Sequence, residues 1–435
     1  MKRVAVVGSG IAGLAAARGL AGHAHVTLYE AGDHFGGHSH TVDVTHGGVT
    51  HGVDCGFLVF NERTYPRLVA LFAELGVATA KSEMSFSAQV PDAGLEWSGA
   101  SLGSVFAQRT NLLRPAFLRM LGEVLRFNRV AHALATSGAG RSLATNNDSV
   151  GDFLDAHRFS AAFRDWYFLP MIACIWSCPT DQMLRFPVAT LLRFCHNHGL
   201  LQIADRPQWY TVRGGSRTYV TKMLASVADA RLGAAVRRIK RLPIGGADLS
   251  TDRGTERFDA VVLACHSDQS LALLADASND EREVLGSIRF QPNRAIVHTD
   301  VSVLPQRKAA WAAWNYERAR RSTGPEPAVC LHYLINRLQP LPFDTPVIVS
   351  LNPVQDPDAA SVHGEFHYAH PVFDRRALAA QERLPSLQGR ADTWFCGAWT
   401  GYGFHEDGLA SGLEVCAAVI ARLAGAARAP VPERA

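Results

Sequence analysis

The pattern of apolar and polar positions predicts a strand, a tight turn, a helix and a second strand within the first 30 residues. Residues 4–7 form a continuous apolar run, which is typical of a buried parallel strand. Residues 15–20 are small and mostly apolar and predict a helix, and residues 25–30 predict the second strand. This order of elements indicates an α/β fold.

The turn between the first strand and the helix has the spacing G-x-G-x-x-G at Gly8, Gly10 and Gly13, and the second strand ends at Glu30. Gly8 permits the tight turn, Gly10 lets the backbone approach a pyrophosphate, and Gly13 lets the helix pack on the strand. The helix N-terminus offers N–H donors to the anion, and Glu30 would accept hydrogen bonds from a ribose 2′-OH. Because the glycines follow a strand, open a helix and precede an acid, they predict a dinucleotide site rather than a structural turn.

Apolar residues recur at helical spacing after Pro115, within a region, 105–200, that we expect to be mainly helical. Five arginines accompany a single acid, Glu123, in this stretch: Arg109, Arg114, Arg119, Arg126 and Arg129. The pattern fits a surface helix with a solvated basic face, which we slightly favour. It also fits a helix that contacts a membrane, with arginines beside phospholipid headgroups.

Other parts of the middle region give weaker signals. Residues 137–148 predict a flexible connection, and the aromatic segment 166–179 predicts core or the wall of a substrate cavity. His196 and His198 would share one face of a strand. Without further ligands they do not predict a metal site, so we consider them polar cavity candidates.

The second half of the chain predicts a return to the first sheet and then a second sheet. Residues 260–264 form a buried strand that turns into a helix at Cys265 and His266. Residues 294–305 alternate like a strand, and two apolar runs follow at short spacing, which predicts a mixed or antiparallel sheet. Three aromatic residues lie on or near this sheet, where packing is favoured over a ligand contact: Trp311, Trp314 and Tyr316.

The stretch GYGFHEDGLASG, residues 401–412, follows a predicted strand that ends at Gly397 and opens a long helix rich in small residues. It contains His405, Glu406 and Asp407. Alone, it fits a helix-capping loop, a catalytic histidine–acid pair or the wall of a cofactor site.

Composition narrows the class of protein. The 435 residues allow two or three domains, and a net charge of +3 is too small to indicate nucleic-acid binding. Eight cysteines without a CxxC pair favour a reducing, cytoplasmic setting and no metal site. Glycines interrupt the N-terminal apolar run, and no run of 18 apolar residues occurs, so neither a signal peptide nor a membrane-spanning helix is expected.

Motifs at both ends resemble those of the FAD-dependent amine oxidase superfamily, which includes flavin amine oxidases, phytoene desaturases and protoporphyrinogen oxidases. Glu30 precedes a glycine doublet at Gly36 and Gly37, and the segment HGVDCGF and the C-terminal glycine-rich segment follow in the superfamily's order. The usual arginine after the doublet is replaced by His38, with Ser39 as an alternative phosphate donor. Together, the dinucleotide motif and the resemblance predict FAD contacts at Gly8, Gly10, Ile11, Ala12, Gly13, Glu30, Ala31, Gly36, Gly37, His38, Ser39, Asp54, Gly56, Phe57, Val236, Cys265, Gly397, His405, Gly408, Leu409 and Gly412.

The resemblance also implies an architecture. We expect a Rossmann-like FAD-binding domain of the GR2 type, assembled from residues 1–80, 207–290 and 391–435. A substrate domain with a mixed sheet and helices would comprise residues 81–206 and 291–390, with 105–200 as its mainly helical part, which faces either solvent or a membrane. The C-terminal helix would point its N-terminus at the flavin, where a partial positive charge stabilises the reduced, anionic form.

The motifs NERTYP, HGLLQ, RGGS and GYGFHEDGL look closest to bacterial FAD-binding proteins associated with cyclopropane-synthase-like lipid methyltransferases. That resemblance implies desaturation of a methylated fatty acyl chain of a phospholipid by hydride transfer to flavin N5, with contact at the inner membrane face. His405 is the candidate catalytic base or flavin-side polar contact. A flavin amine oxidase and a non-catalytic flavoprotein partner of a lipid methyltransferase are the alternatives; no lysine matches the amine oxidase context.

Overall fold

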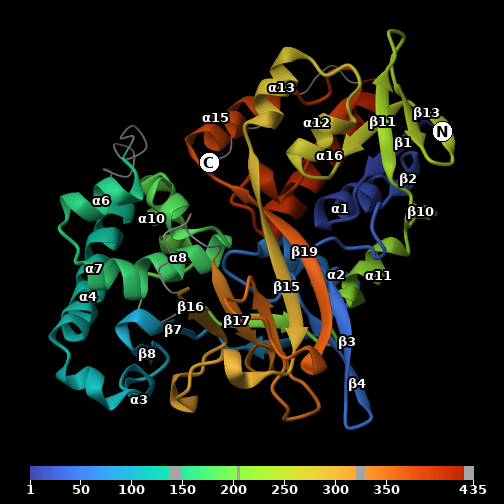
Figure 1. Cartoon of the computed structure of the whole chain (residues 1–435). Helices are drawn as coiled ribbons and strands as arrows, with labels where there is room; N and C mark the ends of the chain where they lie inside the picture. The colour runs from blue at the N-terminus through green and yellow to red at the C-terminus, as the bar shows by residue number, and fades with distance from the viewer. Residues whose placement is uncertain (137–147, 203–205, 320–328, 426–435) are drawn as a thin grey trace.

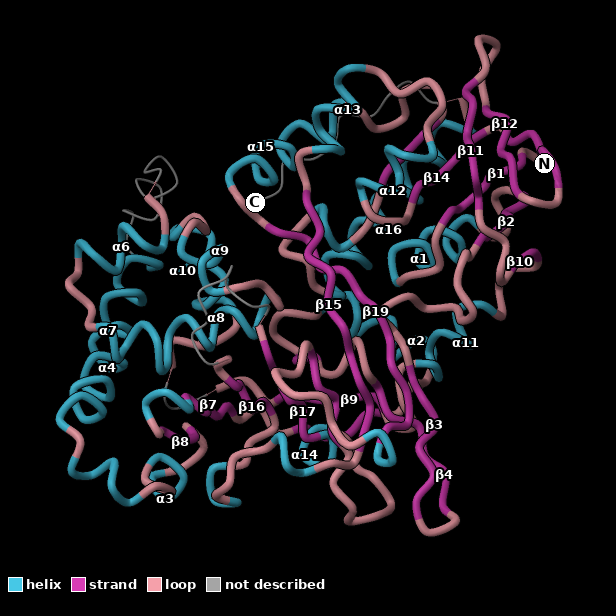
Figure 2. Tube along the Cα trace, in the orientation of Figure 1, coloured by secondary structure: helices cyan, strands magenta, loops and turns pink. Residues whose placement is uncertain are grey.

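The computed structural model describes residues 1–136, 148–202, 206–319 and 329–425. Figures 1 and 2 show two sheet-containing halves, with a group of helices packed beside the second half. Nearly all of the predicted connection at 137–148 lies outside the described residues.

The first half is built on a parallel five-stranded sheet whose strands come from three separate parts of the chain. Its order is β10 (Asp229–Arg231), β2 (His25–Tyr29), β1 (Arg3–Val7), β14 (Ala260–Leu263) and β20 (Thr393–Phe395). Val4 and Val6 of β1 belong to the core that contains α1 and α16, whereas Ala5 and Val7 belong to the core of the opposite layer. Both faces of the strand are thus covered, which agrees with the apolar run predicted at residues 4–7.

Helices and a small antiparallel sheet cover this parallel sheet. The helices of this half are α1 (Ile11–Leu20), α2 (Pro66–Leu75), α11 (Arg217–Leu224), α12 (Ser267–Leu273), α13 (Asn279–Gly286), α15 (Arg375–Arg383) and α16 (His405–Leu423). The small sheet is β11 (Val236–Arg241), β12 (Ala247–Thr251) and β13 (Gly254–Phe258).

The second half contains a seven-stranded mixed sheet, which confirms the predicted sheet type. Its order is β19 (Val362–Val372), β15 (Arg289–His298), β18 (Ile348–Leu351), β17 (Cys330–Leu334), β16 (Trp314–Glu317), β7 (Phe86–Val90) and β8 (Leu95–Ser98). All neighbours are antiparallel except β16 and β7. The long pair β15 and β19 runs upward from this sheet toward the first half (Figure 1).

The remaining short strands form two small sheets. A hairpin is formed by β3 (Thr41–His46) and β4 (Val49–Asp54). A three-stranded antiparallel sheet is formed by β5 (Phe60–Asn61), β9 (Trp209–Val212) and β6 (Thr79–Ser82).

The helical group begins with α3 (Leu102–Val105) and the predicted long helix α4 (Pro115–Thr136). It continues with α6 (Val150–Ala156), α7 (Ala161–Phe163), a π-helical turn η3 (Arg164–Phe168), α8 (Leu169–Trp176), α9 (Thr180–Leu184) and α10 (Val188–Asn197). The aromatic segment lies in η3 and α8 and is largely buried, as predicted. The strand considered for His196 and His198 is wrong, because His196 lies on α10 and His198 caps its C-terminus.

The predicted domain boundaries differ from the structure near residue 391. Ala377 and Ala380 of α15 pack in the same core as β14, together with Leu384 and Leu387. The chain therefore returns to the first half at α15, before the boundary that the sequence suggested. Among the described residues, no helix is long and apolar enough to cross a membrane.

Candidate functional site

The glycine turn after β1 is shaped by two close approaches. Gly8 has a φ of +102°, and a Cβ there would lie 2.8 Å from the carbonyl oxygen of Ala264. A Cβ on Gly13, within α1, would lie 1.9 Å from the carbonyl oxygen of Gly8, so the helix can lie this close to the turn only with glycine at position 13. A Cβ on Gly10 would meet nothing within 4 Å. The turn is therefore open at Gly10, where the sequence predicts the pyrophosphate.

Glu30 follows β2 and is tied to this turn. Its carboxylate accepts hydrogen bonds from the Ser9 backbone N–H at 3.0 Å and from the Ser9 hydroxyl at 2.5 Å. The Gly32 N–H donates to its other oxygen at 2.8 Å. These bonds hold the carboxylate beside the turn, where a ribose hydroxyl is predicted.

The glycine doublet lies against the same turn. Gly36 forms a bridge with Gly10, and its N–H donates to the Ser9 carbonyl oxygen at 3.1 Å. The next side chain, His38, has a buried Nε2 without a hydrogen-bond partner among the described residues. Burial holds the pKa of His38 well below its usual value, so the ring is neutral. These features fit FAD: the open glycine turn has room for the pyrophosphate, the Glu30 carboxylate can accept a ribose hydroxyl, and His38 Nε2 can bond a polar group of the cofactor.

These elements border a cavity of about 420 Å³ that extends into the second half and the helical group. Thirteen residues predicted to contact FAD line it: Gly8, Gly10, Ile11, Ala12, Glu30, Gly36, Gly37, His38, Gly56, Phe57, Cys265, Gly397 and His405. Eight others do not: Gly13, Ala31, Ser39, Asp54, Val236, Gly408, Leu409 and Gly412. Three of the eight, Asp54, Gly408 and Gly412, make contacts that hold neighbouring elements of the cavity wall together.

Asp54 is one of these supporting residues. Its buried carboxylate accepts hydrogen bonds from the Ser216 N–H at 2.8 Å, the Thr41 hydroxyl at 2.6 Å and the Gln339 side-chain amide at 2.9 Å. Desolvation by burial raises the pKa of Asp54 to about 6, even though these hydrogen bonds favour the charged form. The residue joins the β4 end to the RGGS turn before α11.

Gly408 and Gly412 form the contact between α16 and α1. A Cβ on Gly412 would lie 2.2 Å from the Ala12 carbonyl oxygen, and one on Gly408 would lie 2.8 Å from the Ile11 side chain. The Ser411 hydroxyl accepts a hydrogen bond from the Gly397 N–H at 2.9 Å. The small residues thus seat the C-terminal helix on the first helix, and Phe404 and His405 at its N-terminus reach the cavity.

His405 is held by aromatic neighbours rather than by an acid. Its ring stacks on Phe57 with centroids 3.9 Å apart, and its Nε2 lies 2.7 Å from the Tyr219 hydroxyl. That hydroxyl in turn makes a short hydrogen bond with Ser39. Burial lowers the pKa of His405 to about 3, so the ring is neutral and a weak proton acceptor.

The two neighbouring acids act as helix caps. The Glu406 carboxylate accepts the backbone N–H groups of Arg67 and Leu68 at 2.9 and 3.0 Å, at the start of α2. The Asp407 carboxylate accepts the Phe404 N–H at 2.9 Å, at the start of α16. The histidine–acid pair considered from the sequence is therefore absent from the described geometry, and the capping interpretation of the acids is confirmed.

Sequence reasoning missed other residues of the cavity. His370 reaches it from β19, and its Nδ1 accepts a hydrogen bond from the Asn293 side-chain amide at 2.8 Å. Trp314 of β16 lines the cavity, whereas Trp311 donates to the Pro305 carbonyl oxygen at 2.7 Å outside it. Of the two histidines weighed as cavity candidates, His198 lines it and His196 does not. The strand β19, which carries His370, pairs with β15. Its sequence pattern alone does not reveal which of its residues face the cavity.

The cavity is nearly free of formal charge. Among the residues that the structure describes, Glu30, at the glycine end, is the one aspartate, glutamate, lysine or arginine that lines it. Burial lowers the pKa of all five lining histidines: His38, His198, His266, His370 and His405. The remaining wall is mostly apolar and aromatic, which suits an uncharged ligand.

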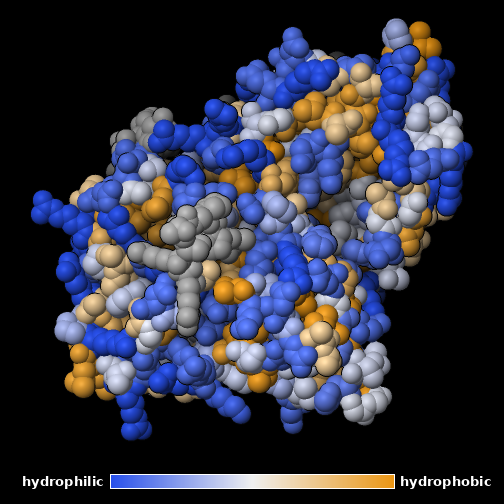
Figure 3. All heavy atoms as spheres, in the orientation of Figure 1, coloured by the Kyte–Doolittle hydropathy of each residue, from blue (hydrophilic) through white to orange (hydrophobic). Residues whose placement is uncertain are grey.

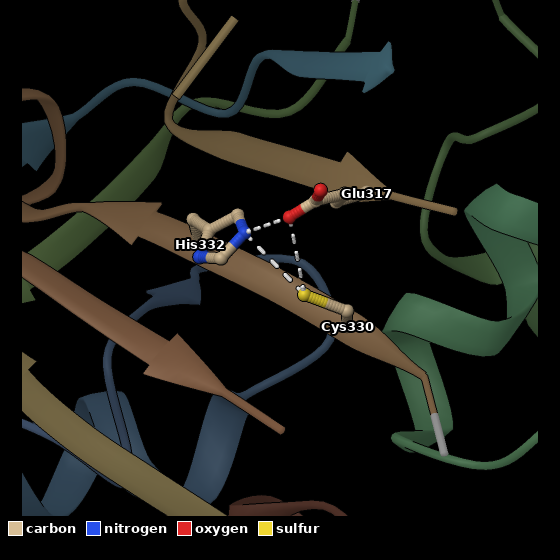
Figure 4. A group of neighbouring side chains, drawn as sticks. All are labelled: Glu317, Cys330 and His332. Atoms are coloured by element: carbon tan, nitrogen blue, oxygen red, sulfur yellow. Dashed lines mark hydrogen bonds and ion pairs between the residues drawn. The ribbon is translucent and has the colours of Figure 1, made fainter. Parts of the chain in front are cut away.

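A separate cluster lies in the seven-stranded sheet, where Glu317, Cys330 and His332 place their ligand atoms within 4.8 Å of one another (Figure 4). The backbone N–H of Asp300 donates to His298 Nδ1, so the proton of the neutral His298 ring lies on Nε2. The Ser350 hydroxyl accepts a hydrogen bond from His298 Nε2 at 2.7 Å and donates one to His332 Nδ1 at 2.7 Å.

In this arrangement His332 Nε2 lies 3.1 Å from the Glu317 carboxylate and 3.3 Å from Cys330 Sγ. The cluster is therefore explained as a hydrogen-bonded network.

Comparisons with known proteins agree with this site. Residues 11–318, more than half of the chain, match the family model described as "Flavin containing amine oxidoreductase". The protein named "Putative flavin-containing monoamine oxidase AofH" from Mycobacterium tuberculosis is 29% identical over 276 residues, which cover 60% of this chain and 56% of that protein. The "Carotenoid phi-ring synthase" of Streptomyces griseus is 29% identical over 315 residues, which cover 66% and 58%. The chain thus spans little more than half the length of these relatives.

Solved structures share the whole fold at low identity. The "CLA-producing fatty acid isomerase from P. acnes" has a TM-score of 0.64 and 17% identity, with 98% of both chains covered. The "Cyclohexylamine Oxidase from Brevibacterium oxydans IH-35A" has a TM-score of 0.67 and 16% identity, with 97% of this chain and 99% of that chain covered. The family match and the glycine turn with its fixed carboxylate lead to one conclusion: the chain belongs to the flavin-containing amine oxidoreductases and has FAD as its cofactor.

Proposed function

We propose that this protein is an FAD-dependent oxidoreductase that desaturates an uncharged, apolar substrate, a methylated fatty acyl chain of a phospholipid. The observation that carries the proposal is the chemistry of the cavity wall beyond the glycine turn. That wall includes Met84, Ile175, Trp176, Leu200, Trp209, Trp314 and Tyr333, and no wall residue in the described part of the chain is an aspartate, glutamate, lysine or arginine. An acyl chain would lose water-exposed apolar surface there without leaving a charge unpaired.

Residues at the glycine end would hold the cofactor. Gly10 and the α1 N-terminus would receive the pyrophosphate, Glu30 the ribose, and His38 a polar group of FAD. When bound, FAD would supply the oxidant: N5 of the flavin would accept the hydride, and the proton lost from the neighbouring carbon would complete the reduced, two-hydrogen flavin.

The protein's own part is to orient the substrate and to exclude water. The Trp176 indole N–H donates to the Tyr402 carbonyl oxygen at 3.2 Å, and Phe194 stacks on Phe404 with centroids 5.0 Å apart. These contacts fasten α8 and α10 to the segment before α16, so that one rigid wall borders both parts of the cavity. A water-poor cavity protects the reaction from hydrolytic side reactions.

For His405 we propose the role of a polar contact beside the cofactor. A pKa of about 3 leaves little basicity, and Nε2 already has Tyr219 as its partner. The ring stacked on Phe57 would form a fixed, neutral wall element.

Anaerobic reduction of the purified flavoprotein tests this proposal. We expect the visible band of oxidised flavin to bleach when phospholipid with methylated, unsaturated acyl chains is added in detergent, and to persist with putrescine or cyclohexylamine. Ile175→Ser, in the cavity wall, should slow bleaching about tenfold because it removes apolar contact. Ile244→Ser changes a side chain that is 85% exposed on the β11–β12 turn and should have no effect.

Bleaching by putrescine or cyclohexylamine but not by the phospholipid would favour an amine oxidase, as the family name suggests. Bleaching by neither class of compound would favour the non-catalytic alternative, in which the flavoprotein serves as partner of a lipid methyltransferase. Both results would contradict the desaturase proposal.

A further inference from the structure

The outer edge of the helical group carries exposed leucines between arginines. We call this surface the leucine–arginine corner: Leu102, Arg109, Leu112, Leu113, Leu118, Arg119, Leu125 and Arg129. Leu102 is 81% exposed and Leu113 is 85% exposed, and Leu112, Leu118 and Leu125 are each roughly half exposed. In Figure 3, hydrophobic and strongly hydrophilic atoms adjoin one another at the lower left, over α3 and the start of α4.

The exposure of these leucines is not explained by the packing of α4. Its buried face is already supplied by Phe117, Met120, Phe127 and Ala131, which are all fully buried. Leu118 and Leu125, seven positions apart, lie on another face of the same helix. Single exposed leucines are normal, but five within one short stretch form a surface that water does not favour.

The charge of the corner is strongly positive. Five arginines accompany one acid between residues 102 and 130, and that acid, Glu123, is buried. Glu123 accepts hydrogen bonds from Ser160 and forms ion pairs with Arg119 and Arg126. Arg109 and Arg129 form no ion pair with any residue that the structure describes.

The corner and the cavity belong to the same group of helices. The α4 helix packs on α7 and α10. Phe194 of α10 and Ile175 of α8 line the cavity. A surface that binds the corner would therefore lie against the helices that form the cavity wall.

We propose that the leucine–arginine corner docks the protein on an anionic phospholipid surface, which is the source of its acyl substrate. Separate leucines on a convex edge can enter the headgroup region one by one, while the arginines remain beside lipid phosphates. The contact is peripheral, since no described helix can cross a membrane. The proposal rests on the acyl substrate proposed above, and lipid binding can be measured without any turnover.

Vesicle co-sedimentation of the full-length flavoprotein tests the proposal. We expect binding to phosphatidylglycerol vesicles that weakens as salt rises, and little binding to phosphatidylcholine vesicles. Leu113→Glu should weaken binding about tenfold or more, and Arg109→Glu about fivefold or more. The matched controls Ile244→Glu, also 85% exposed, and Arg253→Glu should bind like the wild type. All variants should retain flavin and the unfolding midpoint.

Three results would overturn the proposal: no binding to either vesicle, equal binding to both, or equal loss in the control variants. A change from dimer to monomer in Leu113→Glu during size-exclusion chromatography would also overturn it, because the corner would then pair two copies of the chain. Flavin bleaching by the same phospholipid dissolved in detergent is the separate readout. If bleaching occurs without vesicle binding, the docking proposal fails and the proposed function stands.

Discussion

Gly412 determines how closely the last helix approaches the first. Its α-hydrogen faces the Ala12 carbonyl oxygen, and both partners are backbone of well-packed helices. No flexible side chain at this contact can move aside, so even one methyl group must displace a helix.

Gly412→Ala should lower the free energy of unfolding by about 1–3 kcal/mol and reduce the flavin content of the purified protein. Gly122→Ala is the matched control, because this helical glycine is exposed and a Cβ there would meet nothing within 4 Å. It should stabilise the protein by about 0.5–1 kcal/mol through helix propensity. Urea unfolding and flavin absorbance measure both effects, and equal behaviour of the two variants would contradict the contact.

At the scale of elements, Glu406 joins α16 to α2, although it lies 338 positions after its partner Leu68 in the sequence. Glu406→Ala should cost about 1–2 kcal/mol because it leaves two N–H groups at the start of α2 without their acceptor. Glu406→Gln keeps an acceptor oxygen and should cost less. The exposed Glu62→Gln, in the loop before α2, is the control and should be neutral.

Thermal unfolding and flavin reduction together decide between a capping and a catalytic role for Glu406. Capping lowers stability and leaves the rate of reduction in the folded protein nearly intact. A Glu406→Gln variant with normal stability and abolished flavin reduction would indicate that Glu406 takes part in the reaction.

The sequence predicts the elements whose causes are local. The glycine turn, the strands around it and the start of α4 follow from spacing and side-chain size, and the structure places them as expected. The role of Asp54 was not predictable, because its hydrogen-bond partners Ser216 and Gln339 lie 162 and 285 positions away. For the same reason, the glycines of α16 resembled a cofactor motif until α1 was placed against them.

At the scale of the whole molecule, the protein buries many histidines in neutral form. Burial lowers the pKa of His198, His298 and His370 to about 4 and that of His405 to about 3. An unfolded histidine titrates near 6.5, so between pH 6.5 and 4 the unfolded chain binds more protons than the folded one. Stability should therefore be complete above pH 6.5 and fall on acidification, with a slope of at least about 1.4 kcal/mol per pH unit.

Urea unfolding at a series of pH values measures this slope. Asp54 acts in the opposite direction between pH 3.8 and 6, because its raised pKa makes the folded state bind its proton more tightly. Asp54→Asn removes that contribution, so the fall in stability below pH 6 should become steeper. A free energy of unfolding that stays constant from pH 7 to pH 5 would contradict the burial of these histidines.

The contact of α16 with α1 has a consequence for how the protein matures in the cell. The glycine turn leaves the ribosome nearly 400 residues before Gly397 and His405, which line the same cavity. A nascent chain therefore cannot enclose FAD while it is being made. Cofactor capture must therefore wait until both segments have been made and α16 has packed on α1, and FAD that binds only this folded form should stabilise it.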